Sequence, residues 1–385
     1  MDTIPFHHPF IGPEEEEAVI RVLRSGWLTT GKEALAFEEE FGNFLGQGFF
    51  CLAVNSATSG LHLALEALRI GPGDAVFLPT YTFTATAEVV RYLGAEIVFV
   101  DIAPDSYNMD NLALERAIHG FTGTNVKLKP KAIIVVHFGG LPCDMTAINR
   151  TAQNYDLAVV EDAAHAFPVR TLPPSGPWAG TCSDTGVFSF YATKTITTGE
   201  GGMVVTEQED LARRISIMRS HGIDRSVWNR YTDNAASWYY EVTAPGYKYN
   251  LPDLLAAVGR VQLGRAMELL AMRKKIAERY DQAFVNNSSL IIPPREGARH
   301  LYTIRLRKPE GRDSFIESLR SQGIGCSVHF IPLHLMPYYR ERYGLKPEDY
   351  PESAKRYLET VSLPIWPGMS EAQVDRVIES VKRSL

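Results

Sequence analysis

The chain has 385 residues and a net charge of −6 at pH 7, and 45% of its residues are hydrophobic and 22% charged. This acidic balance argues against nucleic acid as a main partner, because no basic excess offsets phosphate charge. The longest apolar runs, near residues 97–100 and 132–138, have the length of strands and are too short to span a membrane. A chain of this length predicts two domains, which we expect at residues 1–255 and 256–385.

The start of the chain, MDTIPFHHPFIG, lacks the basic and apolar regions of a signal peptide. The cysteines are scattered without a CxxC motif or a His/Cys cluster, at Cys51, Cys143, Cys182 and Cys326. This pattern predicts reduced thiols, no metal site and a cytoplasmic location.

Two helices are expected first. Residues 13–24 carry Pro13 at a first-turn position and acidic residues at the positive end of the helix dipole. Their apolar face is expected to hold Val19, Ile20 and Leu23. The turn SGWLTTG, with Trp27, leads to a second helix over residues 34–45, whose core face is expected to hold Leu35, Phe37, Phe41 and Phe44.

A strand over residues 50–54 then enters a small polar turn and a helix that contains Leu61, Leu65 and Leu68. Such a junction exposes backbone N–H groups at a positive helix end, which suits a phosphate. Thr58 and Ser59 would add hydroxyl donors. The same residues also suit a helix N-cap that binds no ligand, so both interpretations stay open here.

Near-continuous apolar strands alternate with helices over residues 74–162. This pattern predicts an α/β domain with a mostly parallel sheet covered on both faces. Ligands of such sheets bind beyond the carboxyl ends of the strands. Several residues able to do chemistry fall at or just after strand ends, namely Phe83, His137, Asp162, His165 and Lys194.

Lys194 lies in a loop of small residues, 193–202, between two apolar, β-prone runs. We expect its amine to sit in a pocket, where partial desolvation lowers its pKa and frees the neutral amine to attack a carbonyl. This chemistry points to a Schiff base with pyridoxal phosphate (PLP). A carboxylate must then keep the pyridine nitrogen protonated, and Asp162 is the natural choice because Glu161 points to the opposite face of its strand.

The remaining chain predicts a helix over residues 209–219 and a long irregular stretch over 220–250 that is expected to be functional. One long helix is expected over 252–284. A small α+β domain should follow, with strands at 290–292, 301–306 and 325–331 and helices at 312–322, 352–358 and 370–382.

The motifs of the chain, in their order, resemble the DegT/DnrJ/EryC1/StrS family of sugar-nucleotide aminotransferases, which have the type I, aspartate-aminotransferase-like PLP fold. The resemblance covers nearly the whole chain and rests on SGWLTTG, NSATSGLHLAL, GDAVFLPTYTFTAT, VHFGGLPCDM, VVEDAAHA, FSFYATKTITTGEGGMVVT, RSHG, GYKYNLPDLLAAVGRVQL and VHFIPLH.

The resemblance implies that Lys194 is the Schiff-base lysine and proton shuttle and that Asp162 pairs with the pyridine nitrogen. It further implies that His165 neighbours the ring oxygen and that Phe83 lies over the ring. Thr58, Ser59 and Ser189 would hold the phosphate, and Trp27 and His329 would lie near the substrate.

The resemblance also implies a homodimer with shared active sites, in which the segment GYKYN reaches the partner through Lys248 or Asn250. GYKYN and TTG look closest to members that aminate C4 of a UDP-4-keto-sugar, with L-glutamate as the donor. Amination at C3 and a non-catalytic regulatory role remain the alternatives. The proline-rich stretch at 169–181 departs from the family pattern in a region that borders the sugar site in relatives.

Overall fold

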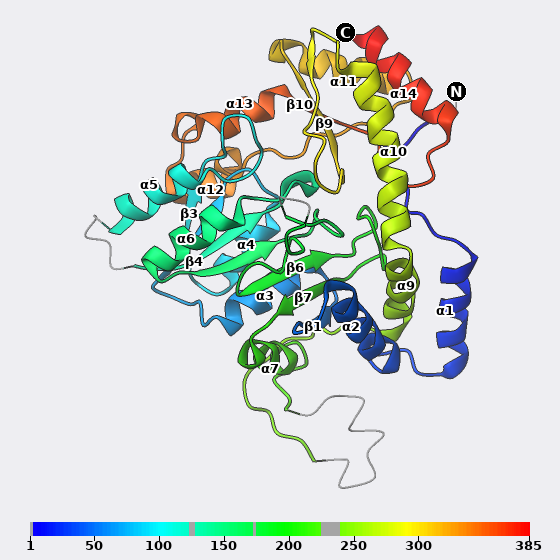
Figure 1. The fold of residues 1–385 in the computed structure, drawn as a ribbon. Helices are drawn as coiled ribbons and strands as arrows, with labels where there is room; N and C mark the ends of the chain where they lie inside the picture. Colours follow the sequence, from blue (N-terminus) through cyan, green and yellow to red (C-terminus); the bar gives the residue numbers. More distant parts are fainter. Residues whose placement is uncertain (1–2, 123–127, 172–174, 225–238) are drawn as a thin grey trace.

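The computed structural model describes residues 3–122, 128–171, 175–224 and 239–385 (Figure 1). Its centre is a seven-stranded sheet in the order β1-β7-β6-β5-β4-β2-β3. The strands are β1 Phe50–Val54, β2 Asp74–Pro79, β3 Glu96–Val100, β4 Lys129–Val136, β5 Ala158–Asp162, β6 Thr185–Ser189 and β7 Gly202–Thr206. Strands β2 to β6 pair in parallel, and β7 runs antiparallel to both β1 and β6. The expectation of a mostly parallel sheet is confirmed.

Alternate residues of the strands pack against helices on opposite faces of this sheet. Val160 of β5 joins a cluster with the helices of one face, whereas the adjacent Val159 joins a cluster with helices of the other face. The first face is covered by α3 Ala57–Ala67, α4 Ala85–Tyr92 and α7 Glu209–Met218. The second face is covered in part by α5 Asn111–Thr122 and α6 Met145–Tyr155. The strands are therefore buried on both sides, which explains their near-continuous apolar sequences.

Four further helices lie over the rest of the second face or beside it (Figure 1). They are α1 Pro13–Ser25, α2 Lys32–Leu45, α9 Asp253–Gly264 and α10 Ala266–Phe284. The buried face of α1 consists of Glu15, Ala18 and Val22. The apolar face expected from the sequence was wrong, because two of its residues, Ile20 and Leu23, are exposed. Leu35 of α2 is also exposed, while Phe37 and Phe41 are fully buried as expected.

The single helix expected over residues 252–284 is two helices, because the helix is interrupted at Arg265, between α9 and α10. The amino-terminal part of α10 packs into the core of the large sheet through Leu269 and Leu270. Its later residues, from Ile276 to Phe284, belong to the core of the smaller sheet. The division of the chain at residue 255 remains a prediction.

The smaller sheet has three antiparallel strands in the order β10-β9-β8: β8 Leu290–Ile291, β9 Tyr302–Leu306 and β10 Thr360–Leu363. The strand expected at 325–331 is absent: Ser327 forms an isolated bridge with Ser362, and Ile324, just before this range, forms one with Ile4. Helices α11 Arg312–Ser321, α13 Pro351–Glu359 and α14 Glu371–Ser384 pack around this sheet. Helix α12 Pro337–Tyr343 instead packs against Phe99 of β3 through Tyr339 and Tyr343. Short 3-10 turns occur at η1 Phe138–Gly140, η2 Pro309–Gly311, η3 Leu333–Leu335 and η4 Pro347–Asp349.

Part of the irregular stretch at 220–250 lies outside the described residues, as do residues 172–174 of the proline-rich stretch. In the part of the chain that is described, no helix combines the length and apolar character needed to cross a membrane.

Candidate active site

A cavity of about 480 Å³ opens at the carboxyl ends of the central strands. Of the residues proposed from the sequence, it brings together Thr58, Phe83, Asp162, His165, Ser189, Lys194 and His329. They come from positions spread over most of the chain, and the parallel strands explain why they meet at one edge of the sheet.

Lys194 lies between β6 and β7 in a loop that folds back on itself. The hydroxyl of Thr197 donates to the carbonyl of Phe190, and the amide of Thr198 donates to the same carbonyl. Burial lowers the pKa of the Lys194 amine to about 8; the nearby Asp162 carboxylate opposes this shift, and the Arg273 guanidinium adds to it. A large fraction of the amine is therefore neutral near pH 8, as nucleophilic attack on a carbonyl requires.

Asp162 ends β5 with its carboxylate facing the cavity, and only 6% of the residue is exposed. Its Oδ2 accepts a hydrogen bond from the Thr86 hydroxyl at 2.8 Å, and its Oδ1 accepts one from the Ala164 amide at 3.2 Å. Burial raises the pKa of Asp162, while these hydrogen bonds and the charge of Lys194 oppose the rise. The carboxylate is thus held in one orientation with capacity left for a cationic N–H group.

His165 lies three residues further along the chain. Its Nδ1 lies 3.2 Å from the amide nitrogen of Gly139 and must accept that hydrogen bond, so the proton of the neutral ring is on Nε2. Burial lowers the pKa of His165 well below its usual value, and the charge of Lys194 adds to this effect. The ring is therefore neutral and offers one N–H donor.

The amino end of α3 forms a second polar region of the cavity, through Ser56, Ala57 and Thr58. The first amides of a helix lack partners within it and point outward, so they suit a phosphate. The hydroxyl of Ser59 instead donates within the turn, to Asn55 Oδ1 at 2.8 Å and the Ser56 carbonyl at 2.7 Å, and Ser59 does not line the cavity. The helix-cap interpretation is confirmed by these hydrogen bonds, and phosphate binding at the same turn stays a prediction.

Phe83 is 57% exposed and faces the cavity, where its ring lies 5.7 Å from that of Phe330. His329 lines the same wall, and its Nδ1 lies 2.9 Å from the Ser362 hydroxyl. Burial lowers the pKa of His329 to about 4, so this imidazole is also neutral.

Several lining residues were missed from the sequence, namely Phe6, His7, Ser56, Thr86, His300 and Phe330. Phe6 stacks on His329 at 5.2 Å, and His7 Nε2 donates to the carbonyl of Ala192 at 2.8 Å. The first residues reach the cavity because Ile4 pairs with residues 323 and 325 of the small sheet region. No local pattern in the sequence signals that pairing; only the threonine-rich run around Thr86 could have been noticed.

Besides Ser59, three proposed site residues do not line the cavity, namely Trp27, Lys248 and Asn250. The indole of Trp27 donates to the carbonyl of Thr30, and Asn250 donates to the hydroxyl of the same threonine. Lys248 is exposed. The described residues of the stretch 169–181 also stay outside the cavity, and Trp178 packs on Phe44 instead.

These residues fit PLP. The lysine amine, the Asp162 carboxylate and the α3 amino end face one cavity, and Gly202 leaves the cradle open because a Cβ there would lie 2.8 Å from the amide nitrogen of Ala57. Sheet and site together define a PLP-dependent transferase of fold type I.

Comparison with known proteins gives the same class. Residues 9–382 match the DegT/DnrJ/EryC1/StrS aminotransferase family. The spore coat polysaccharide biosynthesis protein SpsC of Bacillus subtilis is 43% identical over 391 residues, which cover 98% of this chain and 96% of SpsC. Spr1654 of Streptococcus pneumoniae in its PMP form has a TM-score of 0.89 and 32% identity, covering 99% of this chain and 98% of its own. The sugar aminotransferase CalS13 of Micromonospora echinospora has a TM-score of 0.83 and 28% identity, covering 99% of this chain and 100% of its own.

The chain belongs to the DegT/DnrJ/EryC1/StrS aminotransferase family. It is an enzyme that uses PLP to transfer an amino group, and the resemblance read from its motifs is confirmed.

Proposed function

We propose that this aminotransferase is a sugar aminotransferase that acts in the cytoplasm, moving the amino group of L-glutamate onto a nucleotide-linked 4-keto-sugar. Action on a sugar is supported by the likeness to SpsC and CalS13. Reaction at C4 is supported by the GYKYN and TTG motifs.

The observation that carries the proposal is the meeting of a pKa-lowered lysine and a buried carboxylate, Lys194 and Asp162, in one cavity. A protein that only bound a sugar would gain nothing from the lowered pKa, which is needed when an amine must lose and regain a proton near neutral pH. This pair favours catalysis over a regulatory role.

PLP, when bound, supplies an aldehyde that takes up the amino group and a ring that withdraws electrons from the reacting carbon. Lys194 would hold the aldehyde and, once displaced by the amino donor, move a proton from the donor's α-carbon. Asp162 would keep the proton on the pyridine nitrogen. His165 would donate its Nε2–H to the ring oxygen.

The phosphate would be held by the amino end of α3 and the hydroxyls of Thr58 and Ser189. Phe83 would cover the ring, while His329 and the neighbouring Phe330 would face the sugar. The largely apolar wall excludes water, which strengthens the attraction between Asp162 and a protonated ring nitrogen.

We also propose a homodimer in which GYKYN completes the partner's site. Between its two candidates, Lys248 is favoured, because its side chain is exposed while Asn250 is half-buried and donates to Thr30. Trp27, which neighbours this threonine in the fold, would likewise serve the partner's substrate.

The test is the absorbance spectrum of the purified protein with PLP, before and after addition of L-glutamate. A band near about 420 nm that moves to about 330 nm indicates that the bound aldehyde takes up the amino group. UDP- and dTDP-linked 3-keto- and 4-keto-sugars are then offered to the amine form, and the product position decides between C4 and C3. No visible band in the wild type, with Lys194→Ala behaving identically, would favour the regulatory alternative.

A further inference from the structure

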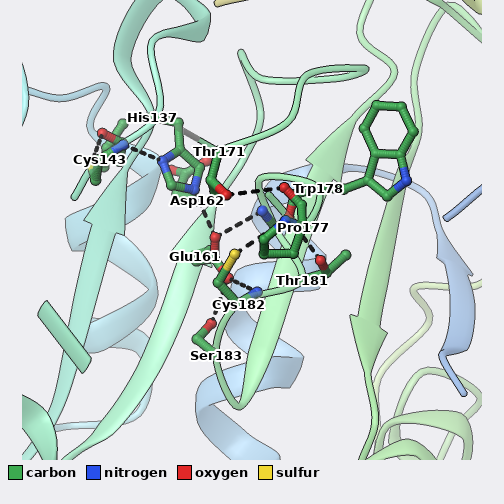
Figure 2. A network of polar contacts seen from close by, with 12 residues as sticks. His137, Cys143, Glu161, Asp162, Thr171, Pro177, Trp178, Thr181, Cys182 and Ser183 are labelled. Atoms are coloured by element: carbon green, nitrogen blue, oxygen red, sulfur yellow. Dashed lines mark hydrogen bonds and ion pairs between the residues drawn. The ribbon is translucent and has the colours of Figure 1, made fainter. Parts of the chain in front are cut away.

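The carboxylate of Glu161 is fully buried on the face of β5 opposite to Asp162, and four donors converge on it (Figure 2). They are His137 Nε2 at 2.8 Å, the Gly180 amide at 2.8 Å, the Cys182 amide at 2.6 Å and the Ser183 hydroxyl at 2.9 Å. A buried carboxylate with this many donors costs little to keep charged, and removing its charge leaves several donors without a partner.

His137 directly follows β4, is fully buried, and is bound on both of its ring nitrogens (Figure 2). Its Nδ1 lies 3.0 Å from the amide nitrogen of Cys143 and must accept that hydrogen bond. Burial opposes a charge on the His137 ring, while the side chains of Cys143 and Glu161 raise its pKa to about 10. Only an unprotonated Nδ1 can accept the Cys143 amide, so this geometry places the ring proton on Nε2, which donates it to Glu161. Glu161 thus fixes the tautomer that allows His137 to hold the Cys143 amide.

The segment between His137 and Cys143 is the tight turn that contains η1, and this turn touches the active site twice. The amide of Gly139 donates to Nδ1 of His165, and the carbonyl of Gly139 accepts the amide of His300 at 3.0 Å. Both histidines line the cavity, and their rings lie 4.4 Å apart. The turn is therefore the link between the buried pair and the cavity wall.

We propose that Glu161 and His137 are positioning residues that hold the turn at 138–143, so that Gly139 keeps the proton of His165 on Nε2, the nitrogen available to the cofactor's ring oxygen. The inference rests on the proposed function of His165. It gives a role to Glu161, the carboxylate of the VVEDAAHA motif that the reaction itself does not use.

The same carboxylate also fixes the end of the proline-rich stretch and the two residues that follow it, through Gly180, Cys182 and Ser183. Gly180 approaches so closely that a Cβ there would lie 2.4 Å from Cζ of Phe188, and Phe188 belongs to β6, which leads to Lys194. Glu161 therefore joins two loops, one on the His165 side and one on the β6 side, at a single point.

The experiment uses Glu161→Gln, which keeps the size of the side chain but replaces one acceptor by a donor. When the new NH2 group faces His137, Nε2 must accept and the ring proton must move to Nδ1, where it opposes the Cys143 amide. The matched control is Asp184→Asn, because Asp184 accepts the Val159 amide at the other end of β5 and lies away from the turn.

The first readout is the tautomer of His165 in the PLP-free protein, from ¹⁵N NMR of labelled histidine rings, with its signals identified by their loss in His165→Gln. We expect a single Nε2–H form in the wild type and in Asp184→Asn, and a mixture in Glu161→Gln. A single Nε2–H form in Glu161→Gln would overturn the proposal. If Glu161→Gln does not fold, His137→Lys answers the same question, because its ammonium group keeps a donor for Glu161 but offers no acceptor to the Cys143 amide.

The second readout is the pH titration of the absorbance of bound PLP. A hydrogen bond donated to the ring oxygen by His165 lowers the pH at the midpoint of this titration. Glu161→Gln should weaken that hydrogen bond and so raise the midpoint by about 0.5–1 pH unit, the effect of about one hydrogen bond. A purely structural role would leave the midpoint unchanged, as expected for Asp184→Asn. If the wild type forms no absorbing complex, the proposed function fails, whereas the tautomer of His165 still decides the positioning role.

Discussion

Lys194 owes its reactivity to where the chain buries it rather than to its loop sequence. Its pKa is lowered by burial, and the partial compensation by Asp162 keeps the lowered value near 8. Burial of this amine lowers the stability of the folded protein, because its charged form loses hydration.

This cost predicts that Lys194→Met stabilises the cofactor-free protein at pH 7. The pKa of the lysine is 10.5 in the unfolded chain and about 8 in the folded chain. The loss of folding stability is therefore complete below pH 8, where both states are protonated, and it disappears as the pH approaches 10.5. The pKa difference, which already includes the attraction of Asp162, is worth about 3 kcal/mol, so we expect a gain of about 2–3 kcal/mol. Urea unfolding at pH 7 measures it. Lys275→Met, at an exposed site on α10, is the control, and equal effects of the two changes would contradict the argument.

Asp162 is expected to matter for the reaction rather than for folding. Asp162→Asn keeps a carbonyl oxygen that can accept from Thr86 or Ala164, but it removes the negative charge that holds a proton on the pyridine nitrogen. We expect bound PLP to be retained and the rate of the glutamate half-reaction to fall by about 100-fold or more. Stopped-flow absorbance measures this rate. Thr86→Val should cost less than Asp162→Asn, and a near-normal rate in Asp162→Asn would refute the assigned role.

At the scale of elements, the junction between β1 and α3 depends on a strand that is distant in sequence. Gly202 of β7 packs directly on the turn at Ser56 and Ala57, and a Cβ there would lie within 3 Å of both residues. The cradle is therefore shaped as much by the absence of a side chain in β7 as by the residues that form the cradle.

Gly202→Ala should accordingly displace this turn. Overpacking of this kind costs about 1–3 kcal/mol of stability, and we expect the Kd for PLP to rise by at least about 10-fold because the α3 amides move out of register with the phosphate. Titration of the protein with PLP, followed by absorbance, checks this. Gly264→Ala is the control, since its Cβ would meet nothing within 4 Å. An unchanged Kd in Gly202→Ala would mean that the phosphate binds elsewhere.

The sequence predicted the central elements well, because buried parallel strands and capped helices carry local signals. The smaller sheet was harder: Thr360–Leu363 is a strand only because it pairs with β9, whereas residues 325–331 look β-prone but find no ladder. The cavity shows the same contrast. Lys194 and Asp162 stand at the ends of recognisable strands, but His7 reaches the site through pairing of Ile4 with distant residues, which no local pattern encodes.

At the scale of the whole molecule, the cavity joins the two sheet regions. Its wall includes Phe6 and His7 from the start of the chain and Ile365 from just after β10, while its floor comes from the central sheet. Arg273 of α10 reinforces this wall, because its buried guanidinium donates to the carbonyls of His300 and Ile365. Movements of the smaller sheet relative to the larger one would therefore change the shape of the site directly.

A homodimer would add a second level of assembly, and subunit mixing tests it. Lys194→Ala should abolish transfer, and Lys248→Ala should lower it by weakening the partner's site. If GYKYN acts across the interface, a mixed dimer has one site with both changes and one with neither. Random mixing of the two variants then gives about a quarter of all sites wild-type activity, in addition to the residual activity of the Lys248→Ala dimers. If Lys248 acts only within its own subunit, every site carries one defect and mixing restores nothing. The refolded mixture is assayed against each variant refolded alone, and Lys275→Ala mixed with Lys194→Ala supplies the reference for half-active dimers.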